Sequence, residues 1–79
     1  MARYYFPCRV GDCLASDAEG VELLSDVDAR FEALRVLVEL ARDEGGLEGN
    51  VELDVRAVDA AGRAFFTASL SGRTPRLPN

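Results

Sequence analysis

One amphipathic segment constrains this chain more than any other feature of its sequence. Between residues 27 and 44 the apolar positions recur at helical spacing, and at 100° per residue they span an arc of roughly 220°. A helix that packs on one side needs an arc of only about 100° or a little more. The sequence therefore predicts a long helix with more apolar surface than one sheet covers. The arc holds Val27, Ala29, Phe31, Ala33, Leu34, Val36, Leu37, Val38, Leu40 and Ala41.

The residues around this segment mark the ends of the predicted helix. Ser25 is the expected N-cap, with Asp26 competing for that role, and Asp28 adds negative charge where the helix dipole favours it. The pair Gly45–Gly46 is typical of a helix C-terminus. Along the polar side, the spacing of the charges predicts two ion pairs, Glu32–Arg35 and Glu39–Arg42.

Strand-like alternation occurs on both sides of the helix. Residues 3–10 alternate, and residues 13–16 are expected to return as a short strand after a turn at Gly11 and Asp12. Residues 51–58 and 63–70 alternate around a turn at 59–62, which begins with Asp and ends with Gly. The positions expected to face inward are Val51, Leu53, Val55, Ala57, Ala64, Phe66, Ala68 and Leu70. In the last strand we expect Phe65 to point outward and Phe66 inward. The order of the elements predicts an α+β fold, in which one long helix packs on a three- to four-stranded antiparallel sheet in the order ββαββ.

The expected domain spans residues 1–70, and residues 71–79, with two prolines, are expected to form a flexible tail. The apolar arc of the helix divides into two sets. The set expected to face the sheet is Val27, Phe31, Leu34, Val38 and Ala41. The remaining set, expected to form an interface, is Ala33, Val36, Leu37 and Leu40. The alternative is that the loops and residues 21–24 cover this second set.

The bulk composition excludes several classes of function. The chain has 79 residues and a net charge of -5, which argues against generic binding to nucleic acid or to anionic membranes. It contains no His, so His-based acid–base catalysis, His-activated nucleophiles and His metal ligands are excluded. All nine basic residues are Arg, which excludes Lys Schiff-base chemistry. No apolar run approaches the length of a membrane span.

The two cysteines and the turn acids are the remaining candidates for chemistry. Cys8 and Cys13 supply half of a zinc site at best, and no signal-peptide pattern precedes them, so we expect free thiols in a reducing cytoplasm. The acidic residues near the first turns do not have the spacing of a calcium loop; they are Asp12, Asp17, Glu19 and Glu22. We therefore expect no catalytic residues, no metal site and no cofactor.

A second candidate surface lies on the outward face of the predicted sheet. If the first and last strands are neighbours, basic and aromatic side chains gather into one patch, made of Arg3, Tyr5, Arg9, Arg63 and Phe65. Aromatic side chains and Arg on an open sheet are how some modules bind single-stranded RNA. The alternative is an ordinary solvent-exposed face, which Glu52 and Asp54 partly neutralise.

Four segments resemble a known family of short bacterial proteins, mostly alphaproteobacterial, that is classified only as a domain of unknown function. They are RYYF at 3–6, DAEGVEL at 17–23, DARFEAL at 28–34 and VDAAGR at 58–63. The chain departs from the family pattern at Pro7 and at residues 68–70. The resemblance implies a small cytoplasmic α+β domain and carries no catalytic residues with it.

Taken together, these features favour a non-enzymatic protein-interaction or regulatory module, with a homodimer as the default because symmetric oligomers are common. The partner would be a second copy of the chain or another protein. Single-stranded nucleic-acid binding on the open sheet face is the alternative. No membrane association is expected.

Overall fold

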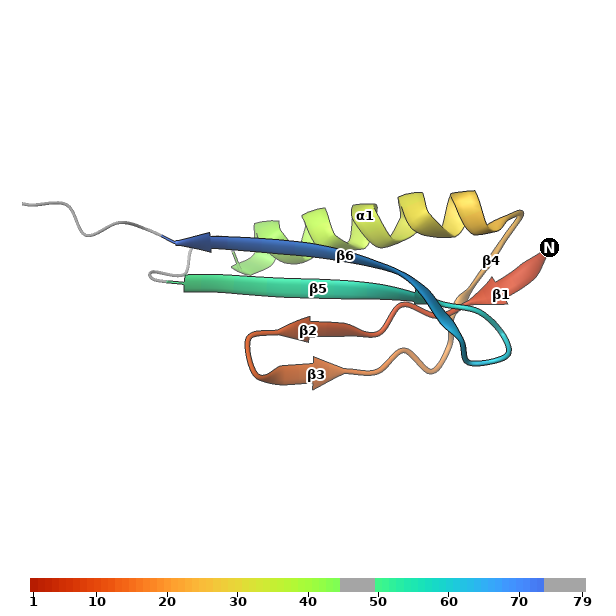
Figure 1. Ribbon diagram of the computed structural model, residues 1–79, viewed down its shortest axis with the longest axis horizontal. Helices are drawn as coiled ribbons and strands as arrows, with labels where there is room; N and C mark the ends of the chain where they lie inside the picture. The colour runs from red at the N-terminus through yellow and green to blue at the C-terminus, as the bar shows by residue number, and fades with distance from the viewer. Residues whose placement is uncertain (45–49, 74–79) are drawn as a thin grey trace, which may run out of the picture.

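The computed structural model describes residues 1–44 and 50–73 of the chain (Figure 1). These residues form one helix and six strands. The strands are β1 (Ala2–Tyr4), β2 (Cys8–Val10), β3 (Cys13–Ala15), β4 (Val21–Leu23), β5 (Asn50–Val58) and β6 (Ala64–Arg73), and the helix is α1 (Asp26–Glu44). The predicted α+β class is confirmed. The helix ends at the last described residue before the predicted Gly45–Gly46 stop, which lies outside the described residues.

All strand pairs are antiparallel, but they form two sheets rather than the single one predicted. β1 pairs with β4, and the other described strands form a four-stranded sheet in the order β3-β2-β5-β6. The larger sheet has the predicted number of strands, but the described chain has six strands rather than the four of the ββαββ order, because each of the two N-terminal strands is interrupted. β6 continues beyond its predicted end at Leu70 to Arg73, and residues 74–79 lie outside the described part of the chain.

Pro7 interrupts the first N-terminal strand between β1 and β2. Its nitrogen carries no hydrogen, so it offers the neighbouring strand only an acceptor. The Arg56 N–H donates to the Pro7 carbonyl at 3.0 Å, and the Tyr5 and Val58 backbones exchange two hydrogen bonds at 2.8 and 2.9 Å. From Tyr5 onward this segment therefore follows β5, although regular pairing is broken at Pro7.

The strand that returns alongside the first one is interrupted as well, between β3 and β4. Asp17 lies in this interruption, next to Phe6. Its carboxylate accepts hydrogen bonds from the Phe6 N–H at 3.0 Å and from the Gly20 N–H at 3.1 Å. Gly20 has φ +71, and an added Cβ would lie 2.7 Å from the Tyr4 carbonyl oxygen. The turn from Asp17 to Gly20 therefore needs both a carboxylate and a glycine at these positions.

The core lies between α1 and the helix-facing side of β5 and β6. Strand alternation places Leu53, Val55 and Ala57 on this side, as the sequence predicts. The Tyr4 hydroxyl donates to Asp26 at 2.7 Å, which raises the pKa of Tyr4 and joins the N-terminal strand to the start of α1. The buried residues are Tyr4, Phe6, Ala29, Ala33, Leu37, Leu53, Val55, Ala57 and Ala68.

The N-cap and the hairpin turn follow the sequence prediction. The Ser25 side chain accepts from the Asp28 N–H at 3.3 Å, and its carbonyl accepts from the Ala29 N–H at 3.1 Å. In the β5–β6 turn, the Gly62 N–H donates to the Asp59 carbonyl at 2.9 Å, and Gly62 has φ 87. Both features depend on local chemistry alone, which is why the sequence predicts them.

Candidate functional site

The structure reverses the predicted orientation of α1. Ala33 and Leu37, assigned to the interface set, are buried against the sheet at 0% and 5% exposure. Val36 and Leu40, from the same set, are half-buried and pack against the core. The predicted set of interface residues is therefore wrong, because these side chains are covered by the protein's own sheet.

The set predicted to face the sheet is mostly exposed. Four of its members lie within one narrow strip of the helical wheel, at helical spacings of four, three and four, and we call them the apolar stripe. Ala41, the fifth member, is half-buried against the core. The exposed fractions in the apolar stripe are Val27 53%, Phe31 67%, Leu34 42% and Val38 55%.

Side-chain size explains which face of α1 meets the sheet. Ala29 and Ala33 lie one turn apart on the buried side, and both are 0% exposed. Such small residues let the helix backbone approach β5 and β6 closely, whereas a phenylalanine in the same place would hold it away. The position of Ala29 next to Ala33 and Leu37 was the sequence signal for this orientation. The surplus of apolar surface predicted for the helix is present, but on the opposite face.

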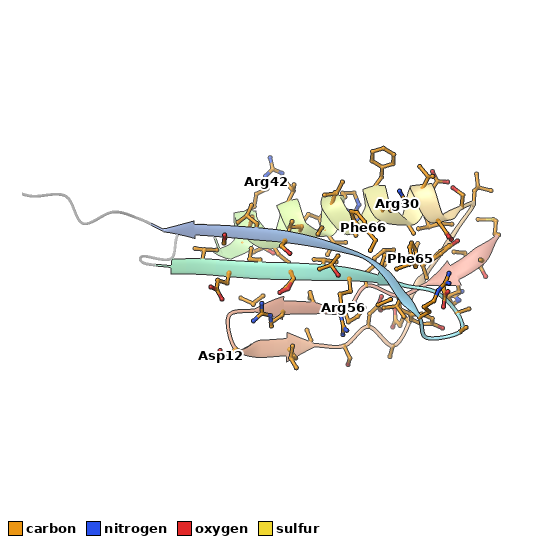
Figure 2. All side chains as sticks on the ribbon, in the orientation of Figure 1. Asp12, Arg30, Arg42, Arg56, Phe65 and Phe66 are labelled. Carbon is orange, nitrogen blue, oxygen red and sulfur yellow. The ribbon has the colours of Figure 1, made fainter. Side chains whose placement is uncertain are left out.

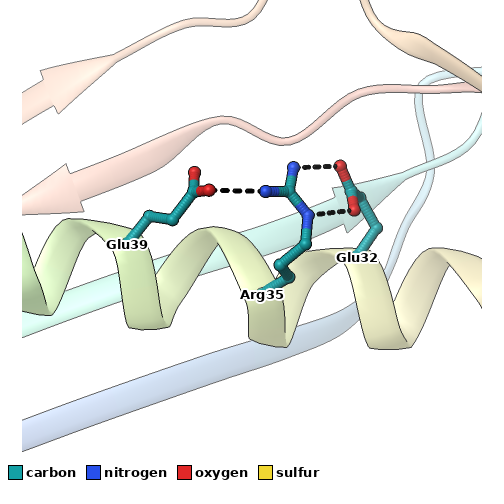
Figure 3. Close-up of polar contacts among 3 residues, drawn as sticks. All are labelled: Glu32, Arg35 and Glu39. Atoms are coloured by element: carbon teal, nitrogen blue, oxygen red, sulfur yellow. Dashed lines mark hydrogen bonds and ion pairs between the residues drawn. The ribbon is translucent and has the colours of Figure 1, made fainter.

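A row of charged side chains lies along the flank of α1 between its buried face and the apolar stripe. The Arg35 guanidinium donates to both carboxylate oxygens of Glu32 at 2.7 Å and to Glu39 at 2.6 Å. Figure 3 shows this row projecting from the flank of α1 nearer to β2 and β3. The Glu32–Arg35 pair is confirmed, whereas Glu39 pairs with Arg35 rather than with the predicted Arg42. The hydrogen bonds from Arg35 lower the pKa of Glu32.

The predicted basic-aromatic patch does not form as one surface. Its condition was that the first and last strands are neighbours, but β5 lies between β2 and β6. Phe65 does not face outward, because the register shifts between Ala57 and Val58 and this β-bulge turns the side chain toward the core. The Phe65 ring packs edge-on against the ring of Tyr4 at a centroid distance of 5.9 Å. Figure 2 shows Phe65 and Phe66 near each other on the helix-facing side of the sheet.

The cations of the predicted patch are each paired with an acid. Arg3 contacts Glu22 at 3.3 Å, and Arg63 contacts Asp59 at 3.3 Å. Arg9 donates to Asp54 on β5 at 2.6 Å, and this hydrogen bond raises the pKa of Arg9. Tyr5 is half-buried with its ring against Gly20. The resulting surface is a set of separate ion pairs rather than a continuous positive platform for phosphates.

The two cysteines lie on the same face of the β2–β3 hairpin and are both free thiols. Cys8 pairs with Ala15, and Cys13 pairs with Val10, so the cysteines are diagonal neighbours. Diagonal neighbours have Cα atoms about 7–8 Å apart, beyond the usual disulfide range of about 4.4–6.8 Å. In the described residues, no group of three or more His, Cys, Asp or Glu side chains is placed to hold a metal ion.

A groove with a volume of about 520 Å³ lies beside the β2–β3 hairpin. Pro7, Cys8 and Leu14 supply much of its apolar wall. Its polar side chains include the Arg9–Asp54 ion pair and Arg56 on β5. Figure 2 shows Arg56 on the part of β5 next to β2. Because Asp54 neutralises Arg9, the charged side chains of the groove leave a net charge of +1, which Arg56 carries.

The fold and the apolar stripe define a class of small α+β proteins in which one helix covers one face of a sheet and exposes a second apolar face to solvent. The chain belongs to the family described as a domain of unknown function, DUF6894, whose family model matches residues 3–71. No curated protein and no solved structure matches the chain. Within the described residues, α1 is not both long and apolar enough to cross a membrane.

Proposed function

We propose that this protein is a non-enzymatic interaction module of the bacterial cytoplasm and that it acts as a homodimer through the apolar stripe on α1. The single observation that carries the proposal is the exposure of Val27, Phe31, Leu34 and Val38 on one face of one helix. Leu24, just before the helix, is also exposed, at 78%.

The size of this surface supports an interface. The four residues of the apolar stripe together expose on the order of 400 Å², which is within the range for the largest patch of a monomer, and such patches are often functional. Scattered apolar residues are normal on protein surfaces, but four along one helix face form a contiguous patch. A domain of 79 residues also buries only about 60% of its unfolded surface, so a second interface adds stability that its core alone does not supply.

The surroundings of the apolar stripe fit the anatomy of an interface. Arg30 and Arg42 are exposed on either side of it on the helical wheel, and Figure 2 shows both on α1. Arg is enriched at protein interfaces, and a polar rim commonly surrounds the apolar centre. A surface used by two identical copies must be complementary to itself, and an apolar helix face meets this condition by packing antiparallel.

Sedimentation analysis or light scattering over a range of protein concentrations tests the proposal. We expect the wild type to dimerise and Phe31→Glu to be monomeric, because a charge at the centre of the stripe would be buried without a partner. Leu14→Glu is the matched control: Leu14 is 79% exposed on β3, away from the stripe, and the same substitution there should leave the dimer intact. A wild type that stays monomeric at millimolar concentration, or a dimer that tolerates Phe31→Glu, would contradict the proposal.

A further inference from the structure

Between the β-bulge at Phe65 and the terminal Arg73, the outer edge of β6 lacks the features that normally keep a sheet edge from pairing. β6 runs from Ala64 to Arg73 at the end of the β3-β2-β5-β6 order, and no other described strand pairs with its outer side. Every residue from 64 to 72 is uncharged, and none is proline. Natural proteins usually protect such edges with charges, prolines or very short strands. The opposite edge, β3 (Cys13–Ala15), is short and follows Asp12, so only β6 offers a long unprotected edge among the described strands.

The hydrogen-bond pattern identifies which backbone groups of β6 point outward. Tyr5 and Val58 exchange hydrogen bonds, and the Gly11 N–H donates to the Glu52 carbonyl, so the even-numbered residues of β5 bond toward β2. The odd-numbered residues of β5 therefore bond toward β6, where their partners are Ala68 and other even-numbered residues. It follows that the outward N–H and C=O groups of β6 belong to Thr67, Ser69 and Ser71.

The apolar stripe lies on the same side of the molecule as this edge. α1 packs across β5 and β6, and Figure 1 shows it running alongside β6. The charged row of Glu32, Arg35 and Glu39 occupies the flank nearer to β2 and β3 (Figure 3). On the helical wheel the apolar stripe lies on the other flank and on the outer surface of α1. A partner that adds to the edge of β6 would therefore also meet the stripe.

From these two surfaces we infer that a second copy of the chain pairs its β6 antiparallel with this β6 through Thr67, Ser69 and Ser71, while the two apolar stripes pack against each other. The inference deepens the proposed function and rests on it. A two-fold axis normal to the sheet places both helices on the same face of one continuous eight-stranded sheet. The four central strands then carry two helices.

The spacing of strands and helices supports this arrangement. Neighbouring strands lie about 4.8 Å apart, so two helices that each cover two strands are separated by about 9.6 Å. Packed helices have interaxial distances of about 8–10 Å. Pairing of the two β6 strands would thus bring the helices to contact distance with no change in either monomer. A helix placed over β2 instead would be too far from its copy.

Amide hydrogen exchange measured by NMR on the wild-type protein, below and above the concentration at which it dimerises, tests the inference. We expect the N–H groups of Thr67, Ser69 and Ser71 to exchange at least about tenfold more slowly in the dimer than in the monomer. The Ala68 and Leu70 N–H groups, which bond to β5, are the internal control and should be protected at both concentrations. A dimer in which the outward groups exchange as fast as in the monomer would overturn the β6 pairing and leave dimerisation through the stripe standing. A chain that is monomeric at every concentration would overturn both.

A substitution at the edge gives an independent measurement. Ser69→Pro removes one outward N–H from each copy but leaves the β5 ladder intact, so the monomer should fold. We expect its dimer to dissociate about 30-fold more readily, from the loss of two hydrogen bonds. Ser69→Ala keeps the N–H and should dimerise like the wild type. An unchanged dissociation constant for a folded Ser69→Pro protein would contradict the pairing, and if this variant does not fold, the exchange measurement on the wild type decides.

Discussion

Two alanine substitutions on opposite faces of α1 should separate the stability of the monomer from the stability of the dimer. Leu37 is 5% exposed in the core, and Phe31 is 67% exposed on the apolar stripe. Leu37→Ala therefore acts on folding, whereas Phe31→Ala acts on association. The two residues are close in sequence and on the same helix, so differences in helix propensity alone cannot produce opposite patterns.

The magnitudes follow from the burial of each side chain. A buried Leu→Ala substitution costs about 3 kcal/mol from lost transfer energy and the remaining cavity. In a domain of this size that corresponds to a fall in Tm of about 15 °C. Phe31 has only a third of its surface covered in the monomer, so its truncation should cost less than about 1 kcal/mol there. In the dimer both copies lose the contact, and we expect dissociation to become about 100-fold easier.

Urea unfolding at low and high protein concentration measures both effects. At low concentration Leu37→Ala should lower the free energy of unfolding strongly and Phe31→Ala only slightly. At high concentration the wild type and Leu37→Ala should gain stability with concentration, and Phe31→Ala should gain much less. If Phe31→Ala costs as much as Leu37→Ala in the monomer, the assignment of the buried and exposed helix faces is wrong.

Three further predictions concern the turn that links β3 to β4. Asp17→Asn should lower the free energy of unfolding by about 2 kcal/mol in urea titrations, because an amide NH₂ replaces one of the two oxygens that accept from the Phe6 and Gly20 N–H groups. Glu19→Gln is the control and should have no effect. Burial favours a higher pKa for Asp17, but its backbone hydrogen bonds outweigh this and hold the pKa below the ordinary 3.8. Stability from Asp17 is thus present above pH 3.8 and lost as the pH falls through the lowered pKa, so unfolding curves below about pH 4 should show a smaller pH dependence for Asp17→Asn than for the wild type. Gly20→Ala should lower Tm by more than about 10 °C in calorimetry, because residue 20 has a positive φ and the added Cβ would lie 2.7 Å from a backbone oxygen. Gly72→Ala is the control: its Cβ would meet open space at an ordinary φ, so Tm should not fall in this way.

The features that the sequence predicts correctly are those set by neighbouring residues. Ser25 caps the helix because its side chain reaches a backbone N–H three residues on. The turn from Asp59 to Gly62 needs a side-chain acceptor and one positive φ, and both residues are present at the required spacing. Strand alternation places Leu53 and Val55 in the core by the same local rule.

The predictions that are wrong concern contacts between elements far apart in the sequence. The patch that included Arg9 and Phe65 required the first and last strands to be neighbours, and the insertion of β5 between β2 and β6 separates them. Alternation alone placed Phe65 outward, but one extra residue in β6 turns it inward. Neither strand order nor the position of a bulge follows from hydropathy periodicity, because periodicity does not state which strand lies opposite.

The periodicity of α1 predicts its apolar positions correctly, but it does not indicate which of the two apolar faces packs on the sheet. Both faces are apolar, so the hydrophobic effect alone does not choose between them in a single chain. The sheet accepts the face with Ala29 and Ala33, since close approach of the helix needs small side chains, and leaves Phe31 outside. For a monomer this arrangement gives up the burial of the largest apolar side chain of the helix. In the dimer that we propose, the face with Ala29 and Ala33 packs on the sheet and the apolar stripe packs on the second helix. Both sets of apolar side chains are then removed from water.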